Sequence, residues 1–236
     1  MNDVRIVAGF TGRFTDGAVS AAPYDTWNLG THVGDDPEAV AANRALLAAR
    51  TGVDAADLVF MEQVHGPDVA IVDDRSAAAV PAVDALITAV PGLALVVLVA
   101  DCVPVLLVDP ASGVRAVVHA GRRGVANGIV ARTVTQLHEL GATPWARLGP
   151  CIGGCCYEVG DDVYDEVVSV APEAAATTRA GTRSLDLRRA VVAQLERAGV
   201  RQISADAACT VDDPGSFSDR RAGRTGRIAG VVAALP

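Results

Sequence analysis

The longest apolar run of the chain extends from Leu93 to Asp109 and is broken once, by Asp101 and Cys102. On both sides of the break the residues are mostly valine and leucine, and Pro104 follows shortly after. A membrane-spanning helix fits this run poorly, because the run is rich in β-branched residues and contains a carboxylic acid and a proline. The run therefore predicts two buried strands around a short break, and the fold has to place both strands inside.

The next apolar segment, residues 114–121, carries His119 close to its end. A carboxylic acid, a thiol and an imidazole in otherwise apolar strands are costly unless they are paired or bound. Thiolate and imidazole are both ligands for zinc and copper. Cys102 and His119, together with His65 at the end of an alternating segment that starts at Leu58, form a candidate metal site. Three protein ligands leave one coordination position open, as in catalytic zinc sites.

Two other interpretations use the same residues. Cys102 can pack as a small hydrophobic residue while the histidines make ordinary hydrogen bonds. Alternatively, Cys102 and His119 form the dyad of a hydrolase, with Asp101 or Asp84 orienting the imidazole. The metal content of the purified protein distinguishes the metal site from the dyad.

Composition narrows the classes of function and the compartment. The chain has 236 residues and a net charge of -8, which argues against a general nucleic-acid-binding protein. Its five cysteines are an odd number, and residues 1–6 show no basic segment followed by an apolar one. No signal peptide and no disulfide framework are therefore expected. We expect reduced thiols, a cytoplasmic location and no membrane partner.

Hydrophobic periodicity predicts an α+β fold in a single domain, residues 1–236, because strands and helices do not alternate strictly as in a doubly wound sheet. A strand ending at His65 is expected to pair with residues 68–73, and an alanine-rich linker follows at 75–82. Further strands are predicted within 5–10, 84–89, 93–109, 114–121, 146–150, 200–205 and 228–235, and helices within 37–52, 129–140, 163–170 and 187–198.

Local signals mark the ends of several elements. Asp36 is expected to cap the first helix, and Gly52 is expected to end it. Residues 121–124 are predicted to form a turn. Asp161 or Asp162 is predicted to cap the helix that follows it.

Two loops carry further functional groups. Residues 151–156 contain a Cys-x3-Cys-Cys pattern, which matches neither a zinc ribbon nor the zinc signature of nucleobase deaminases. A glycine-rich turn with small packing thiols is predicted there, and Cys209 is expected in the core. Residues 220–227 contain four arginines beside glycines. Such a loop holds a phosphate or pairs with neighbouring aspartates at the surface, and both interpretations stay open.

Nine short motifs follow one another along nearly the whole chain. They are Asn28–Asp35, Gln63–Gly66, Asp84–Thr88, Ala100–Leu107, His119–Gly124, Gly149–Gly153, Tyr157–Val159, Leu185–Leu187 and Phe217–Arg221. Each motif alone is modest, but nine in this order are highly specific. The chain resembles the YfiH/YlmD family, long labelled polyphenol oxidase or laccase-like and now described as purine nucleoside phosphorylases with adenosine deaminase activity.

The resemblance implies a zinc site at His65, Cys102 and His119, the residues that the apolar segments already indicated, with copper as the alternative metal. It implies a fold like the catalytic domain of cytotoxic necrotizing factor, a central sandwich of mixed β-sheets with helices outside. The implied partners are phosphate and a purine nucleoside such as adenosine, inosine or methylthioadenosine. The protein is expected to be a monomer.

The resemblance also suggests roles for single residues. Cys102 and His119 are expected to be catalytic, and Asp101 is expected to move a proton or to orient a ligand. The alternative for Asp101 is a structural carboxylate that accepts backbone hydrogen bonds. Three residues that resemble the family's pocket lining are predicted to bind substrate or phosphate: Asn28, His32 and Arg44.

One position departs from the family pattern, because Arg122 stands where the family has the tryptophan of His-Ala-Gly-Trp-Arg-Gly. Purine stacking at that spot is therefore unsupported. The main rival function is an amidase that edits peptidoglycan precursors with Cys102, and a metal-binding module without turnover is a third. A laccase is disfavoured, because multicopper oxidation needs many histidine ligands and the chain has 4 histidines.

Overall fold

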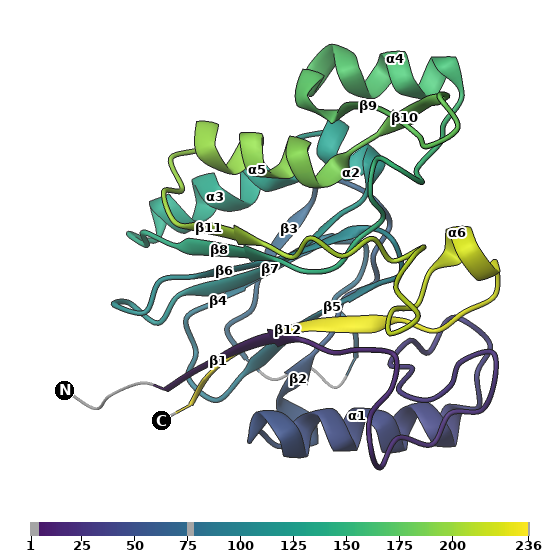
Figure 1. Cartoon of the computed structure of the whole chain (residues 1–236). Coiled ribbons are helices and arrows are strands. Elements are labelled where there is room, and N and C mark those ends of the chain that lie inside the picture. The colour runs from purple at the N-terminus through teal and green to yellow at the C-terminus, as the bar shows by residue number, and fades with distance from the viewer. Residues whose placement is uncertain (1–4, 75–77, 236) are drawn as a thin grey trace.

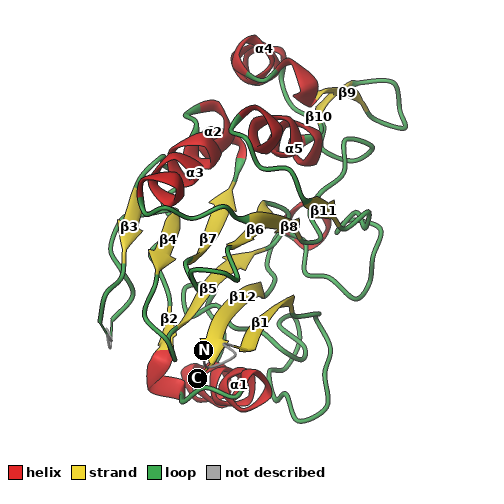
Figure 2. Ribbon diagram, turned by 90° about the vertical axis from the view of Figure 1, so that its left-hand side faces the viewer, coloured by secondary structure: helices red, strands yellow, loops and turns green. Residues whose placement is uncertain are grey.

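Two β-sheets lie face to face, and helices cover the outer side of each sheet (Figure 1, Figure 2). The structure, a computed structural model, describes residues 5–74 and 78–235. The first residues of the segment 1–6 and part of the expected linker 75–82 lie outside the described residues. The layered mixture of strands and helices confirms the predicted α+β fold.

Both sheets are mixed. The four-stranded sheet has the order β1 (Arg5–Phe10), β12 (Ile228–Leu235), β5 (Ala94–Val99) and β2 (Leu58–Val59), and only β2 is parallel to its neighbour. The six-stranded sheet has the order β11 (Ile203–Ala205), β8 (Trp145–Leu148), β6 (Val103–Val108), β7 (Arg115–Ala120), β4 (Ala85–Thr88) and β3 (Val69–Ile71). Its two edge strands, β11 and β3, are parallel to their neighbours. A separate hairpin consists of β9 (Ala175–Thr177) and β10 (Arg183–Leu185).

The helices form the two outer layers. α1 (Pro37–Thr51) packs on the four-stranded sheet, while α3 (Ile129–Glu139) and α5 (Leu187–Arg197) pack on the six-stranded sheet. α4 (Asp161–Val170) lies beside the β9–β10 hairpin at one corner of the molecule (Figure 1). The short helices are α2 (Arg122–Ala126), α6 (Asp219–Ala222) and the 3-10 turns η1 (Ala55–Asp57) and η2 (Pro172–Ala174). Among these helices, which all lie in the described part of the chain, none is long and apolar enough to cross a bilayer.

The apolar run in the middle of the sequence forms β5 and β6, as predicted, and the two strands belong to different sheets. Each strand is buried on both faces, which explains why its sequence is continuously apolar rather than alternating. One face of each strand fills the space between the sheets. The other face of β5 packs against α1, and the other face of β6 packs against α3 and α5. The residues of the two strands between the sheets are Leu95, Val97, Val99, Leu106 and Val108.

α1 begins and ends where the local signals predicted. The Asp36 carboxylate accepts a hydrogen bond from the Glu38 N–H at 3.0 Å and caps the helix. Gly52 ends the helix in the left-handed conformation, with a φ of 77°.

The segment that leads to His65 departs from the prediction. Only its first two residues form a strand, β2, so His65 lies in a loop. The expected pairing with residues 68–73 is wrong, because β3 pairs with β4 instead. The cause is Gln63, whose amide donates to the Leu98 carbonyl at 2.7 Å and accepts from the Leu98 N–H at 2.9 Å. A side chain thus satisfies the backbone groups of β5 at this edge, and the main chain turns away from the sheet.

Three local predictions are also corrected. Residues 121–124 are not a simple turn, because α2 begins at Arg122. The cap residue of α4 is Gly160 rather than one of the two aspartates that follow it. In the arginine loop, α6 adds a short helix that the Ser218 hydroxyl caps.

Replacing Leu106 with alanine should lower the free energy of unfolding by about 2–5 kcal/mol, because the lost side chain leaves a cavity between the sheets. Leu140→Ala is the matched control. The Leu140 side chain is 44% exposed at the end of α3, so its truncation should change stability by about 0.5 kcal/mol or less. Chemical denaturation measures both values. Similar losses in the two variants would contradict a packed core between the sheets.

Candidate metal centre and pocket

Three potential metal ligands meet where the chain crosses from one sheet to the other. Cys102 lies in the short crossing between β5 and β6. His119 lies on β7, where the register with β6 places it opposite Pro104. His65 arrives from the loop after β2. The Cys102 sulfur and one nitrogen of each histidine all lie within 4.8 Å of one another.

The spacing of these groups suits a tetrahedral metal ion. The Cys102 Sγ and His65 Nε2 atoms are 3.8 Å apart, and the His65 and His119 rings meet edge to face with centroids 4.6 Å apart. Ordinary Zn–S and Zn–N bond lengths place the sulfur and nitrogen ligands of a tetrahedral zinc ion about 3.6 Å apart. One thiolate and two imidazoles therefore fit zinc, and they also fit copper.

The carboxylate of Asp84 orients both histidines. It is fully buried. One of its oxygens accepts hydrogen bonds from His119 Nδ1 at 2.7 Å and from the His65 N–H at 3.0 Å. The other oxygen accepts from the N–H groups of Val64 at 3.1 Å and Gly66 at 2.7 Å. These contacts leave Nε2 of His119 for the metal and hold His65 at a φ of 62°, which is unusual for a residue other than glycine.

Gly121 keeps space open beside the ligands. A methyl group at this position would lie 2.7 Å from Cδ2 of His65 and 3.1 Å from Sγ of Cys102. Both distances are shorter than van der Waals contact, so a side chain here would push the ligands apart. The glycine that follows β7 is therefore required by the geometry of the centre.

Cys102 and His119 form a charged pair in the metal-free protein. Burial would raise the pKa of the Cys102 thiol, but the His119 imidazolium and hydrogen bonds from His119 and His65 lower it to about 6. Burial would lower the pKa of His119, but the Cys102 thiolate and the Asp84 carboxylate raise it to about 9. Burial would likewise raise the pKa of Asp84, and its hydrogen bond with His119 holds it below the usual value. A thiolate ligand is therefore present at neutral pH.

A cavity of about 590 Å³ opens beside the three ligands. This volume lies within the range of pockets that hold small molecules. Phe60, Leu98 and Val99 contribute apolar surface to its wall. Charged and polar groups, among them Arg44 and His32, line the same cavity.

A smaller cavity of about 300 Å³ also touches the centre. Ala100, Cys102 and Asp219 line both cavities. Tyr157 and Arg220 line the smaller one, with the Arg220 guanidinium 5.1 Å from the centroid of the tyrosine ring. Cys102 thus stands between two spaces rather than at the bottom of one.

Arg44 brings a positive charge into the larger cavity. Its Nε donates to the Leu29 carbonyl at 3.0 Å, and its guanidinium carbon lies 3.7 Å from the centroid of the Phe60 ring. Burial lowers the pKa of Arg44 to about 10, so the side chain stays charged at neutral pH. Within residues 5–74 and 78–235, no carboxylate pairs with it. A half-buried guanidinium without an acidic partner favours an anionic ligand.

Two of the three predicted substrate residues, His32 and Arg44, line the larger cavity, and Asn28 does not. Asn28 is fully buried. Its amide donates to the Gly30 carbonyl at 3.1 Å and to the Asp35 carboxylate at 2.8 Å. The amide oxygen accepts from the Gly30 N–H and from the Arg227 N–H, both at 2.9 Å. Asn28 therefore acts on the cavity indirectly, by fixing the backbone of Arg227, which does line it.

The Asp101 carboxylate is held by the C-terminal part of the chain. One oxygen accepts from the Thr210 hydroxyl, and the other accepts from the Arg220 N–H at 2.8 Å. Its own carbonyl accepts from the Ile152 N–H at 2.9 Å. Asp101 has a φ of 85°, so these contacts hold an unfavourable backbone conformation beside Cys102. They favour the structural alternative for Asp101, and its catalytic role stays a prediction.

The arginine loop and the residue directly before it supply two cavity residues whose side-chain orientation could not be predicted from the sequence. Arg227 and Asp219 both line the larger cavity and pair at 3.2 Å. Burial raises the pKa of Asp219, and the Arg227 charge offsets part of that effect. The other three arginines of the loop donate mainly to backbone carbonyls or to a tyrosine hydroxyl rather than to aspartates. Asp219 belongs to the motif Phe217–Arg221, but spacing alone could not show that it faces a cavity.

Arg122, the position that departs from the family pattern, begins α2 and lies 3.5 Å from the Glu166 carboxylate on α4. It is not among the residues that line either of the two cavities. Burial and the Cys102 thiolate raise the pKa of Tyr157, and Arg122 acts in the opposite direction. The arginine thus replaces an aromatic ring with an ion pair near the smaller cavity.

The chain belongs to the family described as multi-copper polyphenol oxidoreductase laccase, whose model matches residues 7–235. Among its relatives, the purine nucleoside phosphorylase of Streptomyces coelicolor is 53% identical over 231 residues, which cover 95% of this chain and 93% of the relative. A purine nucleoside phosphorylase of Mycobacterium tuberculosis is 49% identical and covers 92% of this chain and 88% of its own length.

Two solved structures confirm the fold. YlmD of Geobacillus stearothermophilus superimposes with a TM-score of 0.90 at 37% identity and covers 98% of this chain and 92% of its own. YfiH of Bacillus licheniformis has a TM-score of 0.90 at 32% identity and covers 100% of both chains. The resemblance read from the nine motifs is therefore confirmed.

Replacing Asp84 with asparagine should weaken zinc binding about 10- to 100-fold, because the His119 imidazole loses the carboxylate that orients it. Asp109→Asn is the matched control. Asp109 is also a buried carboxylate, but it accepts from Ala111 and Ser112 in the turn after β6. Competition with a chromophoric chelator measures both affinities. An equal loss of affinity in the two variants would contradict the orienting role of Asp84.

In the metal-free protein, iodoacetamide should alkylate Cys102 at a rate that is half-maximal near pH 6, because the reactive thiolate forms as the pH rises through the pKa of about 6. Cys151 is an internal control, since burial raises its pKa to about 12 and it should stay unmodified. Peptide mass spectrometry follows each site. A Cys102 rate that rises only above about pH 8, as for an ordinary thiol, would contradict the charged pair.

Proposed function

We propose that the chain is a zinc-dependent purine nucleoside phosphorylase that also deaminates adenosine. The observation that carries this proposal is one cavity lined both by the candidate zinc ligands and by Arg44, a cation that pairs with no carboxylate among the described residues. Phosphorolysis brings an anion and a neutral nucleoside together, and such a cavity offers a place for each. The names of the relatives at 53% and 49% identity support the same activity.

In phosphorolysis, a phosphate oxygen forms a bond to the anomeric carbon of the ribose while the bond from that carbon to the purine nitrogen breaks. The purine leaves with the bonding electron pair and takes up a proton, so the products are free base and ribose 1-phosphate. A zinc ion held by His65, Cys102 and His119 would supply a positive charge that polarises an oxygen at its open position. The chain itself has to hold the phosphate, seat the purine and deliver the proton.

Arg44 and His32 form the phosphate subsite in this proposal. The Arg44 guanidinium can donate two parallel hydrogen bonds to phosphate oxygens. Burial and the positive charges of Arg227 and Arg44 lower the pKa of His32, so its ring is mostly neutral before the anion binds. A bound phosphate would offset those charges and raise the pKa of His32. Phe60 and its apolar neighbours in the same cavity would take the purine.

Asp219 is better placed than Asp101 to deliver the proton to the leaving purine. Asp219 lines both cavities, and burial raises its pKa, which favours a carboxyl that can donate. Both oxygens of Asp101 are already engaged by Thr210 and by the Arg220 N–H. Asp101 then serves the reaction by fixing the crossing that carries Cys102.

Deamination would use the same centre with water in place of phosphate. The water oxygen bonds to the purine carbon that carries the amino group. The amino group takes up a proton from that water and leaves as ammonia, as its bond to the carbon breaks. The nucleoside has to present its base to the centre in this reaction and its ribose in phosphorolysis. The two activities therefore compete for one cavity and for one bound adenosine.

An amidase that edits peptidoglycan precursors is the second candidate function. It is favoured by the arrangement in which Asp84 orients His119 and His119 lowers the pKa of the Cys102 thiol. In that reaction the thiolate itself would bond to the amide carbonyl carbon while the amine leaves with a proton, and water would then cleave the thioester. A metal bound to Cys102 would block this attack. The two candidates therefore predict opposite effects of zinc.

Zinc-loaded protein incubated with adenosine and phosphate should release adenine and ribose 1-phosphate, with some ammonia and inosine. The variant Cys102→Ala should lose the zinc ion held by His65, Cys102 and His119, and with it both activities, because it removes the one thiolate among these three ligands. Chromatography of the bases and an ammonia assay measure the products. Undiminished turnover in a metal-free Cys102→Ala protein would overturn the proposal. Release of serine from a serine-containing muropeptide precursor by the metal-free wild type, and not by the zinc form, would instead establish the amidase.

Replacing Arg44 with glutamine should raise the KM for phosphate by about 10-fold or more, because a charged hydrogen-bond donor to the anion is lost. Arg50→Gln is the matched control, since Arg50 lies on the same helix and donates to the Asp16 carbonyl outside the cavity. Initial rates at varied phosphate concentration give the two KM values, and the zinc content should stay constant. A KM that is unchanged in Arg44→Gln would exclude Arg44 from the phosphate subsite.

A further inference from the structure

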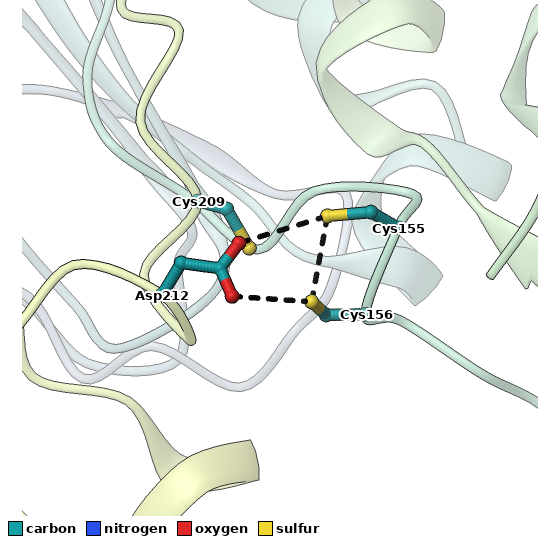
Figure 3. Close-up of side chains that lie close together, drawn as sticks. All are labelled: Cys155, Cys156, Cys209 and Asp212. Atoms are coloured by element: carbon teal, nitrogen blue, oxygen red, sulfur yellow. Dashed lines mark hydrogen bonds between the residues drawn. The ribbon is translucent and has the colours of Figure 1, made fainter. Parts of the chain in front are cut away.

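Four side chains from two distant loops converge at a place that the proposed reaction does not use. Cys155 and Cys156 come from the loop after β8, and Cys209 and Asp212 come from the loop after β11. Figure 3 shows the three sulfur atoms and the carboxylate pointing toward one another. One ligand atom from each residue lies within 4.8 Å of all the others.

The contacts within this thiol cluster are short. The sulfurs of Cys155 and Cys156 are 3.4 Å apart, and they lie 4.0 Å and 3.9 Å from the two carboxylate oxygens of Asp212. The Cys209 sulfur accepts a hydrogen bond from the Gly153 N–H at 3.2 Å. Cys209 is half-buried, so its expected place in the core is wrong, and Cys155 and Cys156 are half-buried as well.

We infer that Cys155, Cys156, Cys209 and Asp212 form a second metal site, for a thiophilic divalent cation such as Zn²⁺. Three thiolates and a carboxylate complete a tetrahedral shell, which is typical of a structural zinc site. Beside the larger cavity, the described residues offer three ligands, His65, Cys102 and His119, and leave one coordination position open. The two sites thus differ in the way that structural and catalytic zinc sites differ.

The distances in the cluster are close to those of a tetrahedral shell. Ordinary Zn–S bonds place two sulfur ligands about 3.8 Å apart, and a sulfur and an oxygen ligand about 3.6 Å apart. The observed separations of 3.4 Å, 3.9 Å and 4.0 Å differ from these values by a few tenths of an ångström. All four ligand atoms lie within 4.8 Å of one another, so the side chains are already gathered around one point.

Arg179 shows that the cluster already attracts a cation. Its guanidinium, on the loop between β9 and β10, donates to both carboxylate oxygens of Asp212, at 2.9 Å and 2.5 Å, and to the Cys156 sulfur at 3.2 Å. Three thiolates and a carboxylate would carry four negative charges, which a divalent ion and one guanidinium largely neutralise. On metal binding, one of the two Arg179–Asp212 hydrogen bonds would give way to the ion, and the other oxygen would keep Arg179, because ligating carboxylates are commonly hydrogen-bonded themselves.

The backbone around Gly153 is shaped for the sulfurs. A methyl group at Gly153 would lie 3.2 Å from the Cys155 sulfur and 3.4 Å from the Cys209 Cβ. Glycine therefore lets both thiols approach the same point. The Gly153 N–H also points at the Cys209 sulfur and holds it in place.

A metal at the cluster would stabilise the two loops that hold the candidate catalytic centre in position. The loop of Cys155 and Cys156 contains Ile152, and the loop of Cys209 contains Thr210. Both residues bind Asp101, the neighbour of Cys102, through the Ile152 N–H and the Thr210 hydroxyl. Joining the two loops through one ion would fix these contacts without touching the substrate.

Metal content tests the inference directly in the variant Cys102→Ala, which lacks the thiolate of the site at His65, Cys102 and His119. Protein purified in a non-thiol reductant and equilibrated with zinc should contain one zinc ion per chain by elemental analysis. Adding Cys209→Ser should remove that ion, whereas adding Cys151→Ala should not, since Cys151 is a buried thiol outside the cluster. One zinc per chain in both double variants, or none in Cys102→Ala itself, would overturn the inference.

Cobalt gives a second readout that needs no substitution of a cysteine in the cluster. Co²⁺ added to Cys102→Ala should produce a near-ultraviolet thiolate-to-cobalt absorption band, and Asp212→Asn should weaken Co²⁺ binding by about 10-fold or more. Asp212 is exposed, and a circular-dichroism spectrum checks that Asp212→Asn keeps the fold after the loss of its ion pair with Arg179. No band, or mass spectrometry showing a disulfide between cluster cysteines in the reduced protein, would count against a metal site.

Discussion

The candidate site depends on one buried carboxylate, that of Asp84. A buried anion is costly unless it is fully hydrogen-bonded, and Asp84 accepts from three consecutive backbone N–H groups and from the His119 ring. The same group thus shapes the loop that carries His65 and selects the tautomer of His119. Because Asp84 directly precedes β4, the six-stranded sheet itself holds the two imidazoles in position.

Burial places the third ligand. β5 and β6 are buried on both faces, yet they belong to different sheets, so the chain between them has to cross the sandwich within three residues. Cys102 lies in that crossing, and Asp101 holds its unusual backbone conformation through contacts with the C-terminal loops. Hydrophobic packing, rather than metal binding, therefore sets the position of the thiol before any ligand arrives.

Sequence patterns were informative where the deciding interactions are local or where apolar burial is complete. The cap at Asp36, the strands on both sides of Cys102 and the three candidate ligands could be predicted, because each leaves a mark in a short segment. The end of β2 could not, because the Gln63 side chain binds the backbone of Leu98, which is distant in sequence. The thiol cluster could not be predicted from the sequence for the same reason, since Cys209 joins Cys155 and Cys156 only in the folded chain. Asn28 shows the converse error, in which a motif residue supports the cavity without lining it.

Cys102 belongs to the walls of two cavities, and this gives the centre two faces. If the larger cavity holds the nucleoside, as proposed, the smaller cavity still borders the same residue. In the proposed reaction a small ligand would then still meet Cys102 from the smaller cavity. The order in which ligands arrive and leave is therefore not dictated by a single opening, and a filled cavity does not seal the centre.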